Sequence, residues 1–239
     1  ELEVAKSLYR RLEAPGALDN VPFGKDKVKM LEISIEKNCP IKNIPLKKLT
    51  EKFPDFKANI LGAMRKGKFV YLKKNDQMLE DDNVYVVVSS DQLTPILKAF
   101  GHEEKVSKNV LIIGGGNIGL HLAKMLASEA QDIYLIDQNE ERLQFISSQI
   151  DVFTIIGDAK SLEVLEIADV YNCDLLIAVT ASEETNLMMS ILAKKFGTKR
   201  AIARINNVDI IKNKKEHYYH ELGVDTLISP THLATEEIQ

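Results

Sequence analysis

The sequence predicts an α/β protein in which a smaller α+β domain precedes a doubly wound parallel sheet. From residue 109 onward, short apolar runs alternate with amphipathic stretches, which is typical of a parallel sheet covered by helices on both faces. The charge also changes along the chain: residues 1–108 carry 20 Lys+Arg and 16 Asp+Glu, whereas residues 109–239 carry 11 and 19. We therefore expect a domain boundary near residue 108, with residues 101–108 as a polar linker.

The composition excludes several classes of protein. Apolar residues make up 45% of the 239 residues and charged residues 28%, as in an ordinary globular protein. No apolar run approaches the ~20 residues that span a bilayer. Lysines in the basic part alternate with acids, so we expect no nucleic acid as a partner. Cys39 and Cys173 lie far apart in unlike contexts, which favours a reducing cytoplasm over a disulfide framework.

The first 100 residues predict one amphipathic helix at 1–13 and a small α+β domain at 21–100. Residues 28–35, VKMLEISI, alternate apolar and polar side chains as a half-buried strand does. Further strands are expected at 58–66, 68–74 and 84–90, and further helices at 46–53 and 92–100.

The rest of the chain alternates strictly between strands and helices. Strands are expected at 109–113, 132–137, 152–156, 174–180, 200–205 and 225–229. Helices are expected at about 117–130, 139–149, 161–171, 182–196 and 208–222. Six strands in this rhythm predict the Rossmann dinucleotide fold over residues 109–239.

A glycine motif with the spacing G-x-G-x-x-G follows the first of these strands and opens a helix. Such glycines permit a tight turn, a close approach to a pyrophosphate, and close packing of helix on strand. The free N–H groups at the helix start then face the phosphates. The motif alone is also typical of a plain turn, but its place between strand and helix favours a nucleotide site. The residues predicted to bind are Gly114, Gly115, Gly116, Asn117, Ile118 and Gly119.

Asp137 ends the second strand of the parallel sheet, 18 positions beyond Gly119. Its carboxylate can accept hydrogen bonds from both hydroxyls of an adenosine ribose. The same charge repels a 2′-phosphate, so NAD or ATP is favoured over NADP. The alternative is a solvated acid at the end of a strand.

Three later strand ends supply the other candidates. Asp158 follows the third strand, where it either accepts a hydrogen bond from an adenine amino group or caps a helix. Thr180 and Ala181 end the fourth strand at the carboxyl edge, where ligands of such sheets bind. Arg204, near the end of the fifth, either reaches phosphate oxygens or forms a buried salt bridge with a helix acid.

The sequence indicates no metal site and no catalytic group. His217 and His220 share one predicted helix, but no third ligand has a suitable spacing, so we expect a solvated face. No Ser/His/Asp or Cys/His arrangement is suggested.

Four stretches of the larger domain together resemble the RCK domains of the TrkA family, the cytoplasmic regulatory subunits of bacterial Trk potassium uptake. They are LIIGGGNIGLHLAKML (111–126), YLIDQNEERL (134–143), IIGDA (155–159) and AVTASEETNLMMSILAKKFG (178–197). IARINN and LISPTHLA fit the same pattern, and the front domain resembles the smaller C-terminal RCK domain. The resemblance covers nearly the whole chain.

The resemblance implies a role for each part. Residues 1–20 would belong to a preceding nucleotide domain, 21–100 to a TrkA-C-type domain and 109–239 to a TrkA-N-type domain. NAD, NADH, ATP or ADP would bind at residues 114–118, Asp137, Thr180, Ala181 and Arg204. The chain would form a homodimer or homotetramer. It would act in the cytoplasm, on the inner face of the membrane, through a membrane-embedded Trk-type potassium transport subunit.

Two functions remain open from the sequence. A nucleotide-binding regulatory subunit that gates a potassium transporter is favoured, because the nucleotide crevice is complete while no catalytic group is evident. The alternative is an NAD-dependent oxidoreductase whose substrate domain is missing or unrecognised. A proton-transfer residue facing the nicotinamide would separate the two, and the sequence indicates none.

Overall fold

The computed structural model describes residues 1–239 except 15, 103–106, 128–131, 208–218, 220 and 232–239. Its contacts divide the chain into two compact units, Arg10–Lys105 and Glu1–Tyr9 with Val106–Gln239. Helix α1 (Leu2–Glu13) contributes residues to both. None of the helices in the described part of the chain has the length and apolar character needed to cross a bilayer.

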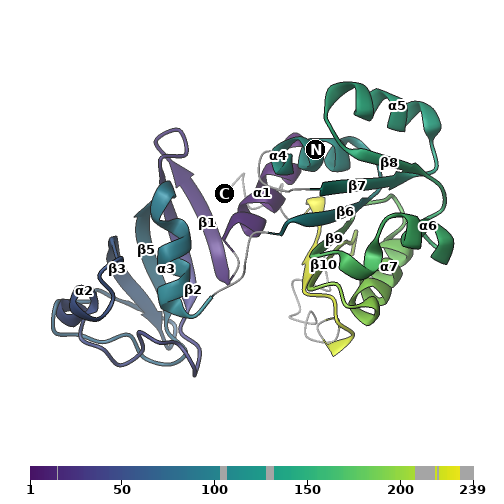
Figure 1. The fold of residues 1–239 in the computed structure, drawn as a ribbon. Coiled ribbons are helices and arrows are strands. Elements are labelled where there is room, and N and C mark those ends of the chain that lie inside the picture. The colour runs from purple at the N-terminus through teal and green to yellow at the C-terminus, as the bar shows by residue number, and fades with distance from the viewer. Residues whose placement is uncertain (15, 103–106, 128–131, 208–218, 220, 232–239) are drawn as a thin grey trace. The chain divides into compact units, whose positions relative to one another are not determined.

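The larger unit contains a six-stranded parallel sheet in the order β11-β10-β9-β6-β7-β8 (Figure 1). Chain order reverses between β6 and β9, which is the topological switch point at which such sheets bind ligands. The strands are β6 (Asn109–Ile113), β7 (Asp132–Asp137), β8 (Phe153–Ile156), β9 (Leu175–Ala178), β10 (Arg200–Arg204) and β11 (Thr226–Ile228).

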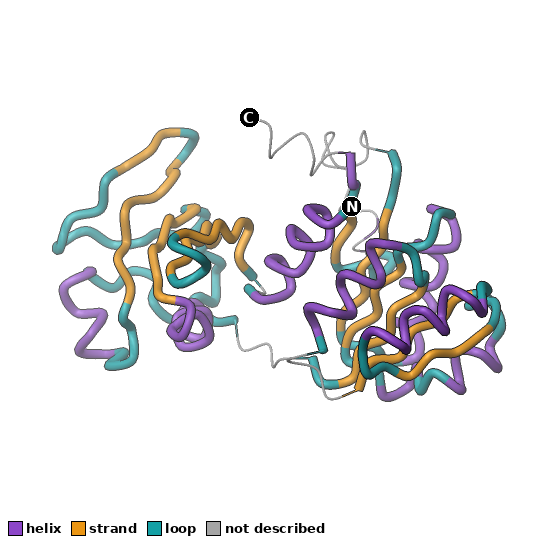
Figure 2. The backbone as a smooth tube through the Cα atoms, turned by 90° about the horizontal axis from the view of Figure 1, so that it is seen from above, coloured by secondary structure: helices purple, strands orange, loops and turns teal. Residues whose placement is uncertain are grey.

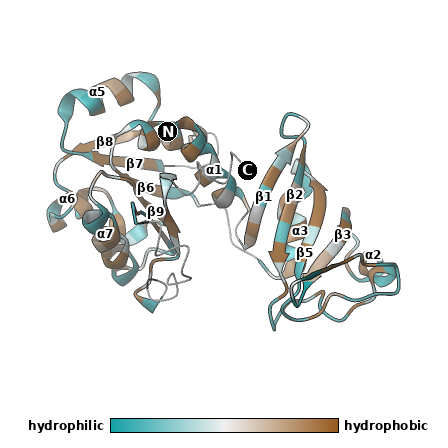
Figure 3. Ribbon diagram, turned by 180° about the vertical axis from the view of Figure 1, so that it is seen from behind, coloured by the Kyte–Doolittle hydropathy of each residue, from teal (hydrophilic) through white to brown (hydrophobic). Residues whose placement is uncertain are grey.

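Helices cover both faces of this sheet. Leu111, Ile113 and Ile136 pack in one core with α6 (Leu162–Ile167) and α7 (Glu183–Phe196). Ile112 and Leu135 point to the other face, beside α4 (Asn117–Leu126) and α5 (Glu140–Gln149). The alternation of strand and helix can be followed along the tube in Figure 2. Because both faces are covered, β6 and β9 are apolar almost throughout, as their colour in Figure 3 shows.

The predicted fold class is confirmed, and each predicted strand of this sheet lies within two residues of an observed one. The helix predicted at 161–171 is shorter than expected, because Asp169 adopts a left-handed conformation (φ 53°) that ends the α-helix. A 3-10 turn, η3 (Val170–Asn172), follows it. The helix predicted at 208–222 falls mainly outside the described residues.

The smaller unit is built on a five-stranded antiparallel sheet in the order β1-β2-β5-β3-β4. Buried and half-buried residues alternate along the central strands, and the buried side chains form one core with α3 (Leu93–Phe100). The strands are β1 (Ala17–Phe23), β2 (Val28–Ser34), β3 (Ala58–Arg65), β4 (Lys68–Val70) and β5 (Asn83–Ser89). Short helices η1 (Leu46–Lys48), α2 (Leu49–Lys52) and η2 (Ser90–Gln92) complete the unit.

The sequence reading missed one strand of this sheet. Residues 17–23, ALDNVPF, form β1, although Asp, Asn and Pro are depleted in strands. Pro22 is tolerated because β1 is an edge strand, where one side of the backbone needs no partner. Strand β4 is shorter than the predicted 68–74 and ends at Val70.

A buried carboxylate ties β3 to the turn before β5. Asp82 is 1% exposed and accepts hydrogen bonds from Nε and Nη2 of Arg65, at 2.8 and 2.7 Å, and from the Leu79 N–H. Burial opposes ionisation, yet the hydrogen bonds from Arg65 and Leu79 outweigh it and lower the pKa of the Asp82 carboxyl.

Replacing Asp82 by Asn should reduce the free energy of unfolding by about 2 kcal/mol at neutral pH, because Arg65 loses its charged partner. The folded-state pKa lies below the unfolded value of about 3.9, so the stabilisation is present above that pH. It is lost as the pH falls through the folded-state pKa, and urea unfolding from pH 7 to pH 3 measures this. Asp81→Asn is the control, since Asp81 is exposed and its positive φ suits Asn. Equal stability of the two variants would contradict the assignment.

Candidate functional site

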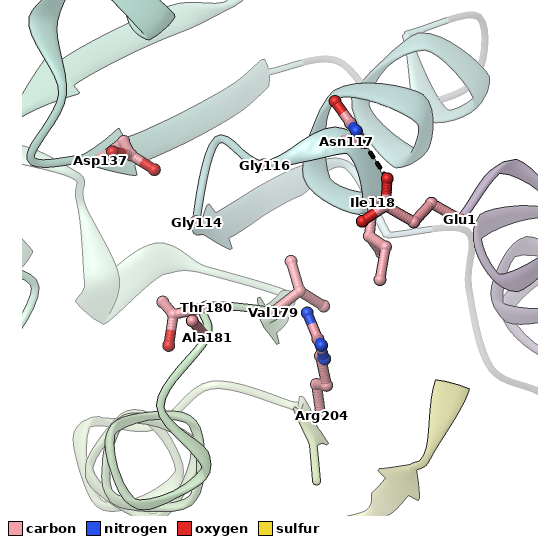
Figure 4. Close-up of a pocket in the computed structure, with 10 residues that line it drawn as sticks. All are labelled: Glu1, Gly114, Gly116, Asn117, Ile118, Asp137, Val179, Thr180, Ala181 and Arg204. Atoms are coloured by element: carbon pink, nitrogen blue, oxygen red, sulfur yellow. Dashed lines mark hydrogen bonds between the residues drawn. The ribbon is translucent and has the colours of Figure 1, made fainter. Parts of the chain in front are cut away.

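A cavity of about 290 Å³ lies at the carboxyl edge of the parallel sheet, where the strand order reverses. Its wall is formed by the ends of β6, β7, β9 and β10 and the start of α4 (Figure 4). The residues that line it are Glu1, Gly114, Gly116, Asn117, Ile118, Asp137, Val179, Thr180, Ala181 and Arg204. The structure thus brings eight of the eleven predicted site residues around one cavity.

The three glycines of the motif have three different surroundings. Gly114 has a φ of 109°, and a Cβ there would lie 3.0 Å from the backbone nitrogen of Thr180. A Cβ on Gly119 would lie 2.0 Å from the Gly114 carbonyl oxygen, so α4 packs on the loop only with glycine at this position. A Cβ on Gly116 would meet nothing within 4 Å, so the fold leaves open space beside it.

The start of α4 faces the cavity with Gly116 as N-cap and no side-chain capping hydrogen bond. Backbone N–H groups at an uncapped helix start need an acceptor, and the helix dipole favours an anion there. This end of the cavity can therefore receive phosphate oxygens.

Asp137 holds the glycine loop from the end of β7. Its Oδ2 accepts a hydrogen bond from the Gly115 N–H at 2.6 Å, and its Oδ1 accepts one from the Asn139 N–H at 2.9 Å. A carboxylate offers about four acceptor positions, so about two remain for ribose hydroxyls. Gly115 itself packs against Ile146 and does not line the cavity.

Arg142, which the sequence reading missed, braces the same loop from α5. Its Nε donates to the Gly115 carbonyl at 2.6 Å and its Nη2 donates to Oδ1 of Asn117 at 2.8 Å. Its guanidinium lies 5.6 Å from the ring centre of Phe145. Arg142 belongs to the NEERL stretch, five residues after Asp137. This spacing alone does not predict a hydrogen bond to the glycine loop, which becomes evident only once the fold is known.

Asn186, also missed, holds the opposite side of the cavity from α7. It is 1% exposed, and its amide binds the backbone of both Thr180 and Arg204. The hydroxyl of Thr180 also donates to its Oδ1 at 2.7 Å.

Arg204 extends its guanidinium from the end of β10 toward the start of α4 (Figure 4). It forms no ion pair with any described residue, so the buried salt bridge considered from the sequence is absent there. Its Nε is buried and has no hydrogen-bond partner among the described residues. A buried donor without an acceptor costs free energy, which an incoming anion would recover.

Asp158 lies outside the cavity lining. Its Oδ1 accepts the Lys160 N–H at 2.9 Å, and this hydrogen bond is the main cause that lowers the pKa of its carboxyl. The N-cap of α6 is Ser161, so the helix-cap alternative for Asp158 is wrong: it closes the turn before the helix.

Glu1 was not expected in the site. Its carboxylate accepts a hydrogen bond from Nδ2 of Asn117, which lowers the pKa of this acid and keeps it charged. The side chain is exposed, so it can turn into solvent when another anion approaches.

Metal ligands and nucleophiles do not gather elsewhere in the described residues. No group of three or more His, Cys, Asp or Glu side chains among them is placed to hold a metal ion. His217 and His220 lie outside the described residues. Cys173 is buried, and this burial raises the pKa of its thiol to about 12, so it is not a nucleophile near neutral pH.

The chain is similar in sequence to proteins of a known family. The TrkA-N domain family matches residues 110–230. The Trk system potassium uptake protein TrkA of Azorhizobium caulinodans is 34% identical over 241 residues, covering 100% of this chain and 52% of the relative. The TrkA homolog of Archaeoglobus fulgidus is 28% identical over 240 residues, covering 100% of this chain and 52% of its own length. The chain thus spans about half the length of the curated relatives it matches.

Solved structures share the fold. The GsuK RCK domain gives a TM-score of 0.58 at 19% identity, covering 95% of this chain and 48% of its own. A structure described as the GsuK channel bound to NAD gives 0.59 at 19% identity, covering 95% of this chain and 40% of its own. With half of its residues matched, including the glycine motif and every strand end that forms the cavity, this chain belongs to the TrkA-N domain family.

Proposed function

We propose that this chain binds an adenine nucleotide, NAD(H) first among the candidates, and that occupancy of the cavity regulates a potassium transporter. The observation that carries the proposal is the buried Nε of Arg204, which has no described partner and lies in a cavity lined by an open glycine loop. The names of the relatives supply the transport setting.

The chemistry of the lining selects a phosphorylated nucleotide. Positive potential comes from Arg204 and from the uncapped start of α4, which suits two linked phosphates. Space beside Gly116 admits them, since no side chain fills it. Asp137 has acceptor capacity left for a ribose at the neighbouring strand end. One solved structure with this fold is described as bound to NAD, which makes NAD the first ligand to test.

The residues that line the cavity favour a regulatory role over hydride transfer. Among the described residues, the titratable side chains that line the cavity are Glu1, Asp137 and Arg204, with no histidine, tyrosine or lysine to move a proton. Enzymes most often use histidine as the acid or base, and carboxylates can also serve. Here both carboxylates are engaged, Asp137 with the Gly115 and Asn139 N–H groups and Glu1 with the Asn117 amide. Steady oxidation of NADH with any metabolite would favour the enzyme instead.

The same proposal covers the domains of the protein, its assembly and its place in the cell. We assign residues 21–100 to a TrkA-C-type domain and residues 109–239 to a TrkA-N-type domain. Because the relatives are about twice as long, the whole protein would carry two such pairs. Pairing of chains as a dimer or tetramer, and a cytoplasmic place against a membrane-embedded potassium transport subunit, belong to the same proposal.

Calorimetric titration with NADH, NAD, ADP and ATP tests the site. Gly116→Val, which puts a side chain into the open space, and Arg204→Met, which removes the charge, should each weaken binding about tenfold or more. Lys199→Met is the control, because Lys199 pairs with Asp174 near the opposite ends of the strands. Wild-type affinity in both site variants would refute the proposal.

The carboxylate of Asp137 should discriminate against a 2′-phosphate. We expect NADPH to bind about tenfold more weakly than NADH, because two negative charges would meet at the end of β7. Asp137→Asn should narrow this ratio, whereas Asp158→Asn should not, since Asp158 lies outside the lining. Equal affinity of the wild type for both cofactors would rule out a ribose role for Asp137.

Potassium uptake by cells that carry the full-length protein tests the regulatory part. With Gly116→Val, uptake should depart from the wild type and stop following nucleotide levels, because the site is filled. Lys199→Met should behave as the wild type at equal protein abundance. Unchanged uptake in a Gly116→Val protein that no longer binds nucleotide would separate binding from transport and reject this part.

A further inference from the structure

We infer that Asn186 is the positioning residue of the nucleotide site, fixing the ends of β9 and β10 so that Arg204 meets the phosphates. This inference rests on the proposed nucleotide binding. It adds to the site a residue that does not line the cavity itself.

The Asn186 amide joins two segments that lie on the same side of the cavity. Its Oδ1 accepts from the Thr180 N–H at 2.9 Å and from the Thr180 hydroxyl at 2.7 Å. Its Nδ2 donates to the Thr180 carbonyl at 3.1 Å and to the Arg204 carbonyl at 2.9 Å. Both N–H donors of the amide are therefore used, and Asn186 itself is 1% exposed.

These hydrogen bonds lie where β9 and β10 no longer pair with each other, since that pairing ends at Ala178 and Ala203, while Arg204 still pairs with Ile228 of β11. Strand β9 ends at Ala178, two residues before Thr180, and β10 ends at Arg204. The Nε of Arg204 is buried and has no hydrogen-bond partner among the described residues, so the direction of that side chain depends on how its backbone is held. Only an amide side chain can form all of these hydrogen bonds, because its oxygen accepts while its NH₂ group donates twice. A carboxylate lacks the donors, and a hydroxyl has only one.

Helix α7 supplies a matched control one turn further on. Ser190 is fully buried and its hydroxyl donates to the Ile202 carbonyl of β10 at 3.2 Å. This hydrogen bond ties the same helix to the same strand, but at Ile202, which does not line the cavity. A role limited to packing α7 on the sheet would make Ser190 and Asn186 behave alike.

The experiment is a double-mutant cycle on ADP and NADH affinity, with Asn186→Ala, Arg204→Met and the double variant, beside Ser190→Ala. We expect Asn186→Ala to weaken binding about tenfold and Ser190→Ala less than about twofold. The loss in the double variant should be close to that of Arg204→Met alone, since both changes remove the same phosphate contact. Full additivity, or equal losses in the Asn186 and Ser190 variants, would overturn the inference.

A second variant covers the case in which Asn186→Ala does not fold. Thr180→Val keeps the side-chain shape at a half-buried position and removes the hydroxyl, which donates to Asn186 at 2.7 Å and also makes longer contacts with the Ser182 backbone at 3.2 Å. It should weaken ADP binding several-fold while thermal unfolding stays near the wild type; wild-type affinity would count against Asn186 as well. A wild-type chain that binds neither ADP nor NADH, or an Arg204→Met variant of full affinity, would instead defeat the proposed function.

Discussion

The site depends on the close approach of two loops at the point where the strand order reverses. Strands β6 and β9 pair in parallel up to Ile113 and Ala178, and the segments that leave them remain in contact. A Cβ on Gly114 would lie 3.0 Å from the Thr180 nitrogen, and the φ of 109° at Gly114 turns the chain toward α4. A side chain at Gly114 would be strained at this φ and would press on the Thr180 backbone. The uncapped start of α4, the open space at Gly116 and the cavity itself all follow from this turn, because it directs the helix across the end of the sheet.

Each side of the cavity is then held by one polar side chain from a helix that follows it in the chain. Arg142 of α5 fixes the glycine loop through the Gly115 carbonyl and the Asn117 amide. Asn186 of α7 fixes the ends of β9 and β10. Neither side chain lines the cavity, and each satisfies backbone groups beside it. Arg204 illustrates the result, since its carbonyl is bonded while its Nε is not.

The sequence was sufficient for the parallel sheet because its signals are local. Apolar runs, helix spacing and the glycine motif each lie within a few residues, and they gave the strands, the fold class and the residues that gather at the cavity. The features that the sequence did not predict depend on contacts between distant parts of the chain. Strand β1 contains Pro22 and becomes a strand only because β2 offers a free edge. Arg142 and Asn186 resemble ordinary helix residues until Gly115 and Arg204 are placed beside them. Whether Asp158 caps the following helix was open for the same reason, since it depends on the turn that Asp158 closes with the Lys160 N–H, and the cap of α6 is Ser161.

These contacts also limit how a bound nucleotide can act on the protein. A ligand shifts a conformational equilibrium only by binding one state better than another. The glycine loop has little freedom, because Gly114 is packed against Thr180 and Gly119 against the Gly114 carbonyl. The side chain of Arg204 has more, since no described group holds its Nε and the exposed carboxylate of Glu1 can leave the cavity. A phosphate that pairs with Arg204 would therefore reorient this side chain, rather than move the glycine loop. Because Asn186 bonds the Arg204 carbonyl, any shift of that backbone would reach α7, which lies on the face of the sheet opposite α4.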